Sequence, residues 1–181
     1  MTTTIATTSA TKIATNRPGV TLRLATRDDV ALILALIREL AEYEREPDAV
    51  QTDEAMLAAN LFGAQPGAEV VIAEADGQPA GFALFFHNFS TWLGRRGLYL
   101  EDLFVRPEYR GRGVGQVLMA YLAKLALERG CGRFEWSVLD WNTPAIDFYR
   151  RLGATGMDEW TVQRVTGDAL QALAASFAPR G

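Results

Sequence analysis

The spacing of hydrophobic residues along the chain changes repeatedly between the two-residue period of a strand and the 3.6-residue period of a helix. Residues 20–25 alternate apolar and polar side chains, as a strand with one buried face does. From residue 30, apolar side chains recur at every third or fourth position, which is typical of a helix with one buried face. In chain order, the pattern predicts a strand over 20–25, helices over 28–44 and 52–62, strands over 69–75, 81–89 and 98–105, a helix over 113–130, a strand over 133–140, a helix over 143–153, a strand over 159–166 and a short helix over 168–177.

Capping residues and prolines set the expected limits of these helices. Asp28 or Asp29 is expected to cap the first helix, and Pro47 to end it. Thr52 is the expected cap of the second helix. Pro144 stands at the first position of a later helix, where the missing amide hydrogen costs nothing.

The order of the elements predicts the fold class. Three strands follow one another directly between residues 69 and 105, which favours hairpins over parallel crossovers. We therefore expect one α/β (α+β) domain over residues 19–181, with helices flanking a mixed and mostly antiparallel central sheet. Residues 1–18 carry no periodic pattern, so we expect a flexible tail; an organelle-targeting peptide is the alternative, because this segment has basic residues and no acid.

Composition narrows the classes of function. The chain has 181 residues, 49% of them hydrophobic, and a net charge of −4 with a pI of about 5.1, so nucleic-acid binding is not expected. No apolar run reaches the ~18 residues that span a bilayer, so no membrane association is expected. Cys131 is the single cysteine, which rules out an internal disulfide and favours a reduced, cytoplasmic setting.

Charged residues are distributed unevenly. The two interpretations are a pair of solvated faces, or an anion site and a cation site within one acidic protein. The basic group is Arg95, Arg96, Arg106, Arg110 and Arg112, and the acidic group is Glu39, Glu42, Glu44, Glu46, Asp48, Asp53 and Glu54.

Three glycines precede the longest predicted helix. Gly111, Gly113 and Gly115 stand at alternate positions, so the backbone turns sharply and leaves its amides open to an anion. The first N–H groups of a helix lack partners, and Arg110 and Arg112 add positive charge at the rim. A diphosphate fits such a site. The spacing differs from both the G-x-x-x-x-G-K-[ST] and the G-x-G-x-x-G loops.

The pattern R-x-x-G-x-G, which follows a strand and the residues RPEY, resembles that of the GNAT superfamily of N-acetyltransferases. The resemblance runs from about Val20 to the C-terminus. Within the superfamily, the chain is most similar to the diamine (spermidine/spermine) N-acetyltransferases through the segments RELAEYE, LYLEDLFVRPEYRGRGVG and WNTPAIDFYRRLGA. The GNAT fold implies a splayed strand pair, here between residues 98–105 and 133–140.

The resemblance implies acetyl-coenzyme A (acetyl-CoA) as cosubstrate. The amides around the glycines are expected to hold its pyrophosphate, and the preceding strand is expected to pair with its pantetheine arm as an added strand would. The cofactor-binding residues implied in this way are Leu103, Phe104, Val105, Arg110, Gly111, Arg112, Gly113, Val114, Gly115, Asn142 and Arg150.

The resemblance also assigns an acid and a base. A protonated amine, with a pKa near ~10, must lose a proton before it attacks the thioester. Glu101 is the implied base, acting through ordered water, and Tyr149 is the implied acid beside the departing sulfur. The alternative for Tyr149 is an aromatic ring packed between helix and sheet.

Three residues match the substrate side of the diamine enzymes: Glu44, Trp92 and Asp102. Because strand residues alternate between faces, Glu101 and Asp102 are not expected to face one cleft. The alternative for either carboxylate is an ion pair with a nearby arginine. The match is loose at residues 157–160, which leaves the preference for polyamines open.

The sequence therefore predicts an enzyme that acetylates a primary amine of a small diamine or polyamine by direct attack in a ternary complex. The alternatives are an acetyltransferase for a lysine-like amino acid such as thialysine or for a protein amine, and a non-catalytic acyl-CoA-binding module. No metal site is expected, since His87 is the single histidine and is interpreted as a strand-end residue. A homodimer is implied by the resemblance alone.

Overall fold

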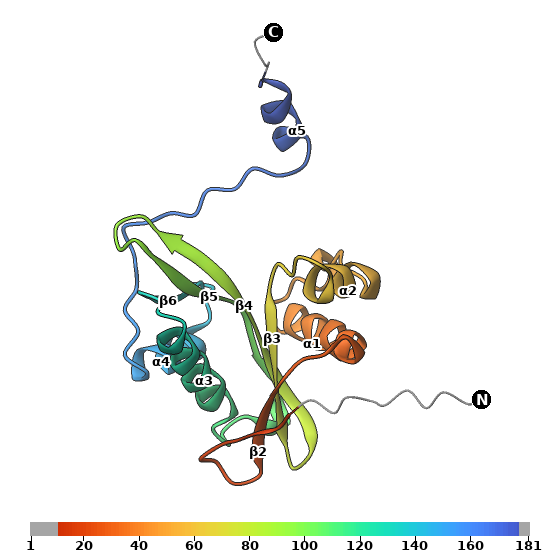
Figure 1. Cartoon of the computed structure of the whole chain (residues 1–181), viewed down its shortest axis with the longest axis vertical. Helices are drawn as coiled ribbons and strands as arrows, with labels where there is room; N and C mark the ends of the chain where they lie inside the picture. The colour runs from red at the N-terminus through yellow and green to blue at the C-terminus, as the bar shows by residue number, and fades with distance from the viewer. Residues whose placement is uncertain (1–10, 178–181) are drawn as a thin grey trace, which may run out of the picture. The chain divides into compact units, whose positions relative to one another are not determined.

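The structure, a computed structural model, describes residues 11–177 and divides into two compact units, Met1–Ser137 and Val138–Gly181, which are described separately. The first unit is built on a six-stranded sheet in the order β1-β2-β3-β4-β5-β6, antiparallel except for the parallel pair of β5 and β6 (Figure 1). The expected α/β class with a mostly antiparallel sheet is confirmed, while the single domain over 19–181 stays a prediction. The strands are β1 (Ile13–Ala14), β2 (Val20–Leu24), β3 (Glu69–Ala75), β4 (Gln78–Ser90), β5 (Arg95–Val105) and β6 (Phe134–Trp136).

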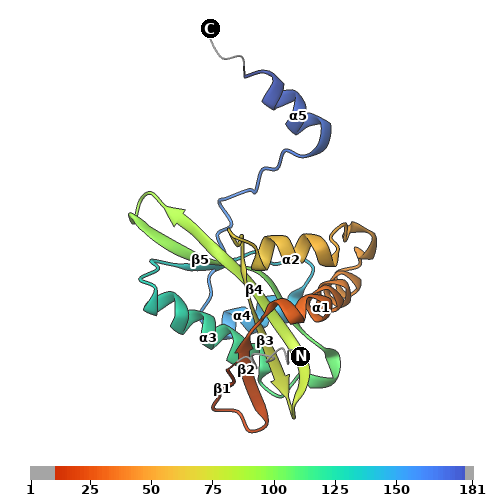
Figure 2. The same cartoon turned by 45° about the vertical axis from the view of Figure 1, so that its right-hand side comes forward.

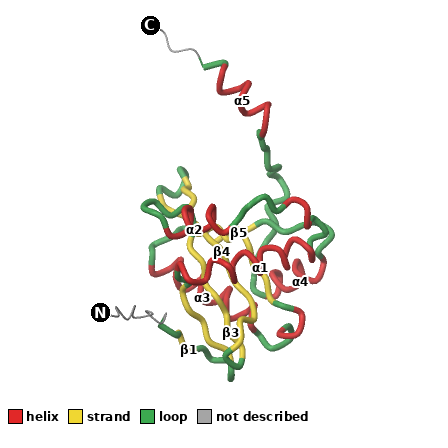
Figure 3. Tube along the Cα trace, turned by 90° about the vertical axis from the view of Figure 1, so that its right-hand side faces the viewer, coloured by secondary structure: helices red, strands yellow, loops and turns green. Residues whose placement is uncertain are grey.

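Helices cover both faces of this sheet (Figures 1 and 2). α1 (Val30–Tyr43) and α2 (Glu54–Phe62) lie on one face, in front of the strands in Figure 3, and α3 (Val114–Glu128) packs on the other face against β3, β4 and β5. Beneath α1 and α2, Phe82 of β4 and Phe104 of β5 join the helices in one apolar core. Short 3₁₀ turns occupy Arg27–Asp29, Pro47–Ala49 and Pro107–Tyr109.

The second unit contains α4 (Thr143–Arg151) and α5 (Gly167–Ala175). The strand predicted over residues 159–166 is wrong, since this segment has no regular structure. An alternating pattern forms a strand only beside another strand that accepts its backbone hydrogen bonds and covers one face. Here Trp160 and Val162 are exposed. None of the helices among residues 11–177 has the length and apolar character needed to span a membrane.

Two predicted helix limits need correction. The cap of α2 is Asp53 and not Thr52, because the Asp53 carboxylate accepts a hydrogen bond from the Met56 amide at 2.7 Å. α1 ends before Pro47, where Arg45 adopts a left-handed conformation with φ of 66°. The expected cap at the start of α1 is confirmed in position, since Asp29 immediately precedes its first residue.

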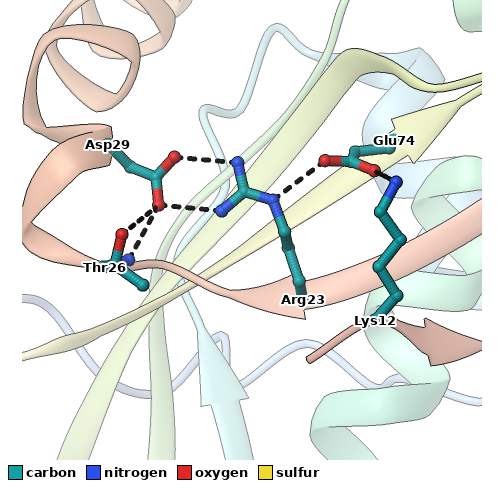
Figure 4. Close-up of polar contacts among 5 residues, drawn as sticks. All are labelled: Lys12, Arg23, Thr26, Asp29 and Glu74. Atoms are coloured by element: carbon teal, nitrogen blue, oxygen red, sulfur yellow. Dashed lines mark hydrogen bonds and ion pairs between the residues drawn. The ribbon is translucent and has the colours of Figure 1, made fainter. Parts of the chain in front are cut away.

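Part of the tail expected over residues 1–18 belongs to the sheet, and residues 1–10 of it lie outside the described part of the chain. β1 pairs with β2, and Lys12 forms an ion pair with Glu74 of β3 at 2.6 Å. Glu74 also accepts a hydrogen bond from Arg23, whose other two nitrogens bind Asp29 at 2.8 Å (Figure 4). Asp29 in turn accepts from the Thr26 amide and hydroxyl. This charged network joins the N-terminal hairpin to β3 and to the start of α1. The hydrophobic pattern of the sequence gives no sign of it.

Candidate active site

β5 carries a bulge at its two adjacent carboxylates. Leu84 of β4 pairs with Asp102, but the next residue, Phe85, pairs with Leu100, so Glu101 is an extra residue in β5. Leu84 and Asp102 face α1, because Leu84 packs against the core beneath that helix, whereas Phe85 and Leu100 face the other way. Glu101 is the residue at which the alternation of β5 is interrupted, and its charge acts on Asp102. The expectation that the two carboxylates face opposite ways assumed unbroken alternation, and it stays a prediction.

The acids on this face have no cationic partner. Within residues 11–177, Glu101, Asp102 and Glu44 form no ion pair, so the alternative of a salt bridge to a nearby arginine fails. Burial, followed by the charges of Glu101 and Glu44, raises the pKa of Asp102 to about 6. Burial also raises the pKa of Glu44. The structure thus brings the end of α1 and the bulge of β5 together into a site that favours a cation.

β5 and β6 separate at this bulge. Before it, the two strands are joined, and the Leu98 amide donates to Arg133 O at 3.0 Å. Their ladder ends where Leu100 meets Trp136, whereas β5 continues to Val105. No other strand of the described residues pairs with the rest of β5 on this side. This is the splayed strand pair that the resemblance implied.

The hydrogen-bond alternation of β5 determines which of its amides face the open side. The Arg106 amide donates to Ala80 O at 2.9 Å, at the end of the ladder with β4. Because bonding residues alternate along an antiparallel pair, the main chain of Phe104 also faces β4, and the N–H groups of Leu103 and Val105 point away from it. Two of the three residues expected to pair with pantetheine therefore have main-chain groups directed outward.

The glycine-rich turn before α3 leaves several amides without partners. Gly111 and Gly113 have φ of 75° and 82°, a left-handed conformation that only glycine adopts without strain. The first hydrogen bond into α3 runs from the Val117 amide to Gly113 O at 3.0 Å. Among the hydrogen bonds of residues 11–177, none is donated by the amides of Val114–Gln116. These amides are those of the expected cradle, and the binding of an anion there stays a prediction.

Arg110 and Arg112, expected to be mobile charges at the rim of the cradle, are instead held by the protein. Arg110 Nε donates to Val105 O at 2.9 Å, and its guanidinium carbon lies 4.7 Å from the centre of the Tyr43 ring. Arg112 forms an ion pair with Asp76 at 2.7 Å. Sequence reasoning missed Tyr43, because nothing in its helical position signals a contact with Arg110, 67 residues later in the chain.

The remaining cofactor and catalytic candidates lie in the second unit, on α4. Asn142 is buried and caps this helix, with Oδ1 accepting from the Ala145 amide at 3.3 Å. Tyr149 is half-buried and, two helical turns after Asn142, lies on the same side of α4. Arg150 is exposed, 3.7 Å from Asp147. The predicted helix thus aligns Asn142 and Tyr149; cofactor binding by Asn142 and Arg150 and the catalytic role of Tyr149 stay predictions.

Trp92 is not brought to the acids of its own chain. It lies in the turn between β4 and β5 and is 88% exposed, near exposed Phe89 and Leu93. From Arg95, the first residue of β5, to Asp102 the strand extends roughly 20 Å at about 3.3 Å per residue. The expected contact of Trp92 with the same substrate molecule as Asp102 therefore finds no support within the first unit.

His87, expected at a strand end, lies within β4 beside a charged pair. Arg129, after α3, binds Glu69 of β3 through both carboxylate oxygens and approaches His87 Nε2 at 3.4 Å. Burial and the Arg129 charge lower the pKa of His87. A cavity of about 420 Å³ lies beside the start of β3 and the middle of β4, and it is lined by Pro66, Gly67, Ala68, Glu69, Phe85, Phe86 and His87. Residues 11–177 contain no cluster of three metal-ligating side chains.

Comparison with known proteins gives the class to which this arrangement belongs. Residues 33–154 match the model of the acetyltransferase (GNAT) family, which is more than half of the chain. The chain therefore belongs to the GNAT family, and it is an acetyltransferase. Members of this family use acetyl-CoA.

Individual relatives extend the match beyond that segment. The chain is 42% identical over 167 residues to thialysine N-epsilon-acetyltransferase of Sus scrofa, covering 86% of this chain and 98% of that protein. It is 31% identical to spermidine/spermine N(1)-acetyltransferase-like protein 1 of Homo sapiens over 84% of this chain and 23% of that protein. Among solved structures, an integron cassette protein from Vibrio cholerae has a TM-score of 0.74 at 28% identity, covering 86% of this chain and 98% of its own.

Proposed function

We propose that the protein transfers the acetyl group of acetyl-CoA to a primary amine of a small substrate that carries a second amine. The observation that carries this proposal is the group of three acids at the bulge of β5: the charges of Glu101 and Glu44 act on Asp102, and among residues 11–177 none of the three forms an ion pair. Repulsion among these acids is relieved when a polycation binds. The single cysteine, Cys131, supports a reducing, cytoplasmic setting.

The acceptor classes are suggested by the relatives. One relative is named for thialysine and another for spermidine and spermine. Thialysine resembles lysine, so both classes present a terminal primary amine on a flexible chain with a further amine some atoms away. A site with three carboxylates suits such a substrate better than a monoamine, because each ammonium group finds a partner. The diamine and the lysine-like amino acid are therefore the two acceptors to compare.

The donor would bind along the open side of β5 and at the start of α3. The outward amides of Leu103 and Val105 offer hydrogen bonds to the amide-bearing pantetheine arm, as an added strand would. The unbonded amides of Val114–Gln116 and the positive end of the α3 dipole suit the pyrophosphate. Asn142 and Arg150 are proposed to complete the binding of the cofactor.

The chemistry requires three groups. Glu101, which is exposed at the bulge of β5, is proposed to take the proton of the ammonium group through water, which frees the nitrogen lone pair for attack on the thioester carbonyl. The Val105 amide is proposed to donate to the oxyanion of the tetrahedral intermediate. As the carbon–sulfur bond breaks, Tyr149 is proposed to give its proton to the departing thiolate.

A panel of amines tests the proposal by following the release of free thiol. We expect turnover with a diamine, a polyamine or a lysine-like amino acid, and at least tenfold less with a monoamine of equal length. Tyr149→Phe is expected to lower kcat by 10² or more while the affinity for coenzyme A stays within twofold. Binding of coenzyme A without thiol release for any amine would instead identify an acyl-CoA-binding module.

We also propose that two copies of the chain associate. The exposed Phe89, Trp92 and Leu93 at the turn between β4 and β5 form an apolar tip that a second copy would cover. If Trp92 serves the site of the other copy, then mixing Trp92→Ala with Glu101→Gln restores activity, because one of the two sites in the mixed dimer is intact. A monomer by light scattering, or no recovery on mixing, contradicts this arrangement.

A further inference from the structure

The hairpin of β1 and β2 is a fixed part of the first unit. Its turn is closed by Thr15, whose hydroxyl donates to Val20 O at 2.7 Å. Lys12 binds Glu74 of β3 by an ion pair of 2.6 Å, next to the Arg23 network of Figure 4. The residues between the two strands are therefore held in place from both ends.

The turn of this hairpin also reaches the start of α3. The Asp76 amide donates to Gly19 O at 2.8 Å, and the Asp76 carboxylate binds Arg112 of the glycine-rich turn at 2.7 Å. Gly19 has φ of 72°, and a β-carbon there would lie 2.5 Å from the Asp76 carboxylate. The hairpin and the glycine-rich turn are thus packed against each other through Asp76.

Arg17 lies over the amide cradle. Its Nη2 donates to Gln116 Oε1, in the first turn of α3, at 2.8 Å. A β-carbon on Gly113 would lie 2.9 Å from Arg17 Nε, so the guanidinium group covers the glycine at which the helix begins. The cradle therefore has a cationic side chain that comes from a segment 99 residues before Gln116 in the chain.

The charge of Arg17 is not neutralised. Among residues 11–177 its side-chain acceptor is the neutral amide of Gln116, whereas Arg112 beside it is paired with Asp76. Arg110 is held by Val105 O and the Tyr43 ring. Arg110 is thus held by a backbone carbonyl and an aromatic ring, and Arg112 by a carboxylate, whereas the partner of Arg17 is the amide side chain of Gln116, which can rotate away. A phosphate oxygen is a stronger acceptor for a guanidinium than an amide oxygen.

We infer that Arg17 binds the pyrophosphate of the acetyl donor, and that the N-terminal hairpin is thus a part of the cofactor site. This inference rests on the proposed function, which places the pyrophosphate at the start of α3. It adds a contact outside the region that matches the family model, residues 33–154. On binding, the guanidinium exchanges Gln116 Oε1 for phosphate oxygens and remains over Gly113, at the start of α3.

Steady-state kinetics with three donors test the inference. With acetyl-CoA, Arg17→Gln is expected to raise KM about 5- to 20-fold with kcat unchanged, because one exposed charge-assisted contact is lost. The same change is expected with 3′-dephospho-acetyl-CoA, which keeps the pyrophosphate. With acetyl-pantetheine, which lacks it, Arg17→Gln and the parent protein should have equal KM. With acetyl-CoA, the KM of Arg17→Lys should lie between those of the parent and of Arg17→Gln, because lysine keeps the positive charge but lacks the two parallel N–H donors of the guanidinium group.

Two variants serve as controls. Lys12→Gln weakens the anchor of the hairpin without touching the cradle, and Arg27→Gln removes a charge that binds carbonyls of α2. Both should keep the parent KM for acetyl-CoA. An equal rise in Lys12→Gln would overturn the inference, since hairpin stability would then explain the effect.

Other outcomes also decide the matter. An unchanged or lower KM for acetyl-CoA in Arg17→Gln excludes the contact. A rise in KM that is seen with acetyl-CoA but not with 3′-dephospho-acetyl-CoA assigns Arg17 to the 3′-phosphate and overturns the pyrophosphate assignment. Calorimetric titration of coenzyme A separates this from the wider proposal. A parent protein that binds coenzyme A, more tightly than Arg17→Gln does, but acetylates no amine contradicts the proposed function and upholds the Arg17 contact.

Discussion

Two groups of carboxylates in the first unit have opposite surroundings. Asp29, just before α1, and Glu74 of β3 share the guanidinium of Arg23, and every contact in Figure 4 joins opposite charges or a donor and an acceptor. Glu101 and Asp102, at the bulge of β5, have no ion pair with any cation of the described chain. The carboxylates of the first group are therefore neutralised by cations of the protein itself. Those of the second group would be neutralised by a bound cationic substrate.

The pKa values of Asp29 and Asp102 are shifted in opposite directions, as these surroundings require. Burial alone would raise the pKa of Asp29, but hydrogen bonds from Arg23 and Thr26 outweigh it and hold the pKa below its usual value. For Asp102, burial and neighbouring charges act in the same direction and raise the pKa to about 6. A protein tolerates such an unfavourable group where function requires it, at some loss of stability.

The largest effect is expected from Glu101→Gln. If this carboxylate takes the proton of the amine, kcat should fall by about 10² to 10⁴, with the free energy of unfolding nearly unchanged because Glu101 is exposed. Thiol release under saturating acetyl-CoA measures the loss. Glu108→Gln, an exposed acid just after β5, is the matched control and should retain parent activity. Full activity in Glu101→Gln would remove the proposed base.

Arg23→Met removes the cation that Asp29 and Glu74 share. It leaves Asp29 and Glu74 without their shared cation in a partly buried place, so the free energy of unfolding should fall by about 2–4 kcal/mol at pH 7. Urea titration measures it, and Arg38→Met on the exposed side of α1 should change it by less than about 0.5 kcal/mol. Equal stabilities for the two variants would show that the pairing contributes nothing.

Asp102→Asn should stabilise the protein while it weakens substrate binding. The folded pKa of about 6 lies above the unfolded value of 3.8, so Asp102 favours folding below pH 4 and this contribution is lost as pH rises to 6. Asparagine removes the buried charge, and the variant should gain about 1–3 kcal/mol at pH 8. KM for a diamine should rise about tenfold. A parent-like pH dependence of stability between pH 4 and 7 would contradict this assignment.

Glu44→Gln is expected to have the smallest effect. Its charge is one of those that raise the pKa of Asp102, so the pH below which diamine binding weakens should shift downward. KM for the diamine should rise only about 2- to 5-fold, since one of three charges is removed and the site stays anionic. Glu42→Gln, an exposed neighbour on α1, is the control. The interpretation fails if both variants behave alike.

The sequence by itself determined most of the local structure. The 3.6-residue period predicted α1 and α3, the two-residue period predicted β2 to β5, and the glycines predicted the turn before α3. These features depend on near neighbours, because periodicity, capping and left-handed conformations are properties of a few adjacent residues. The cradle of amides could therefore be predicted, as could the helix that carries Asn142 and Tyr149.

Only the tertiary structure decided how the charges are arranged. The expectation for Glu101 and Asp102 assumed unbroken alternation, and a bulge that depends on the register with β4 interrupts it between them. The same pattern predicted a strand at residues 159–166 that has no strand partner. Arg17, in the expected tail, meets α3 about a hundred residues later in the chain. Pairing, register and long-range contacts depend on residues far apart in sequence, and no local pattern contains them.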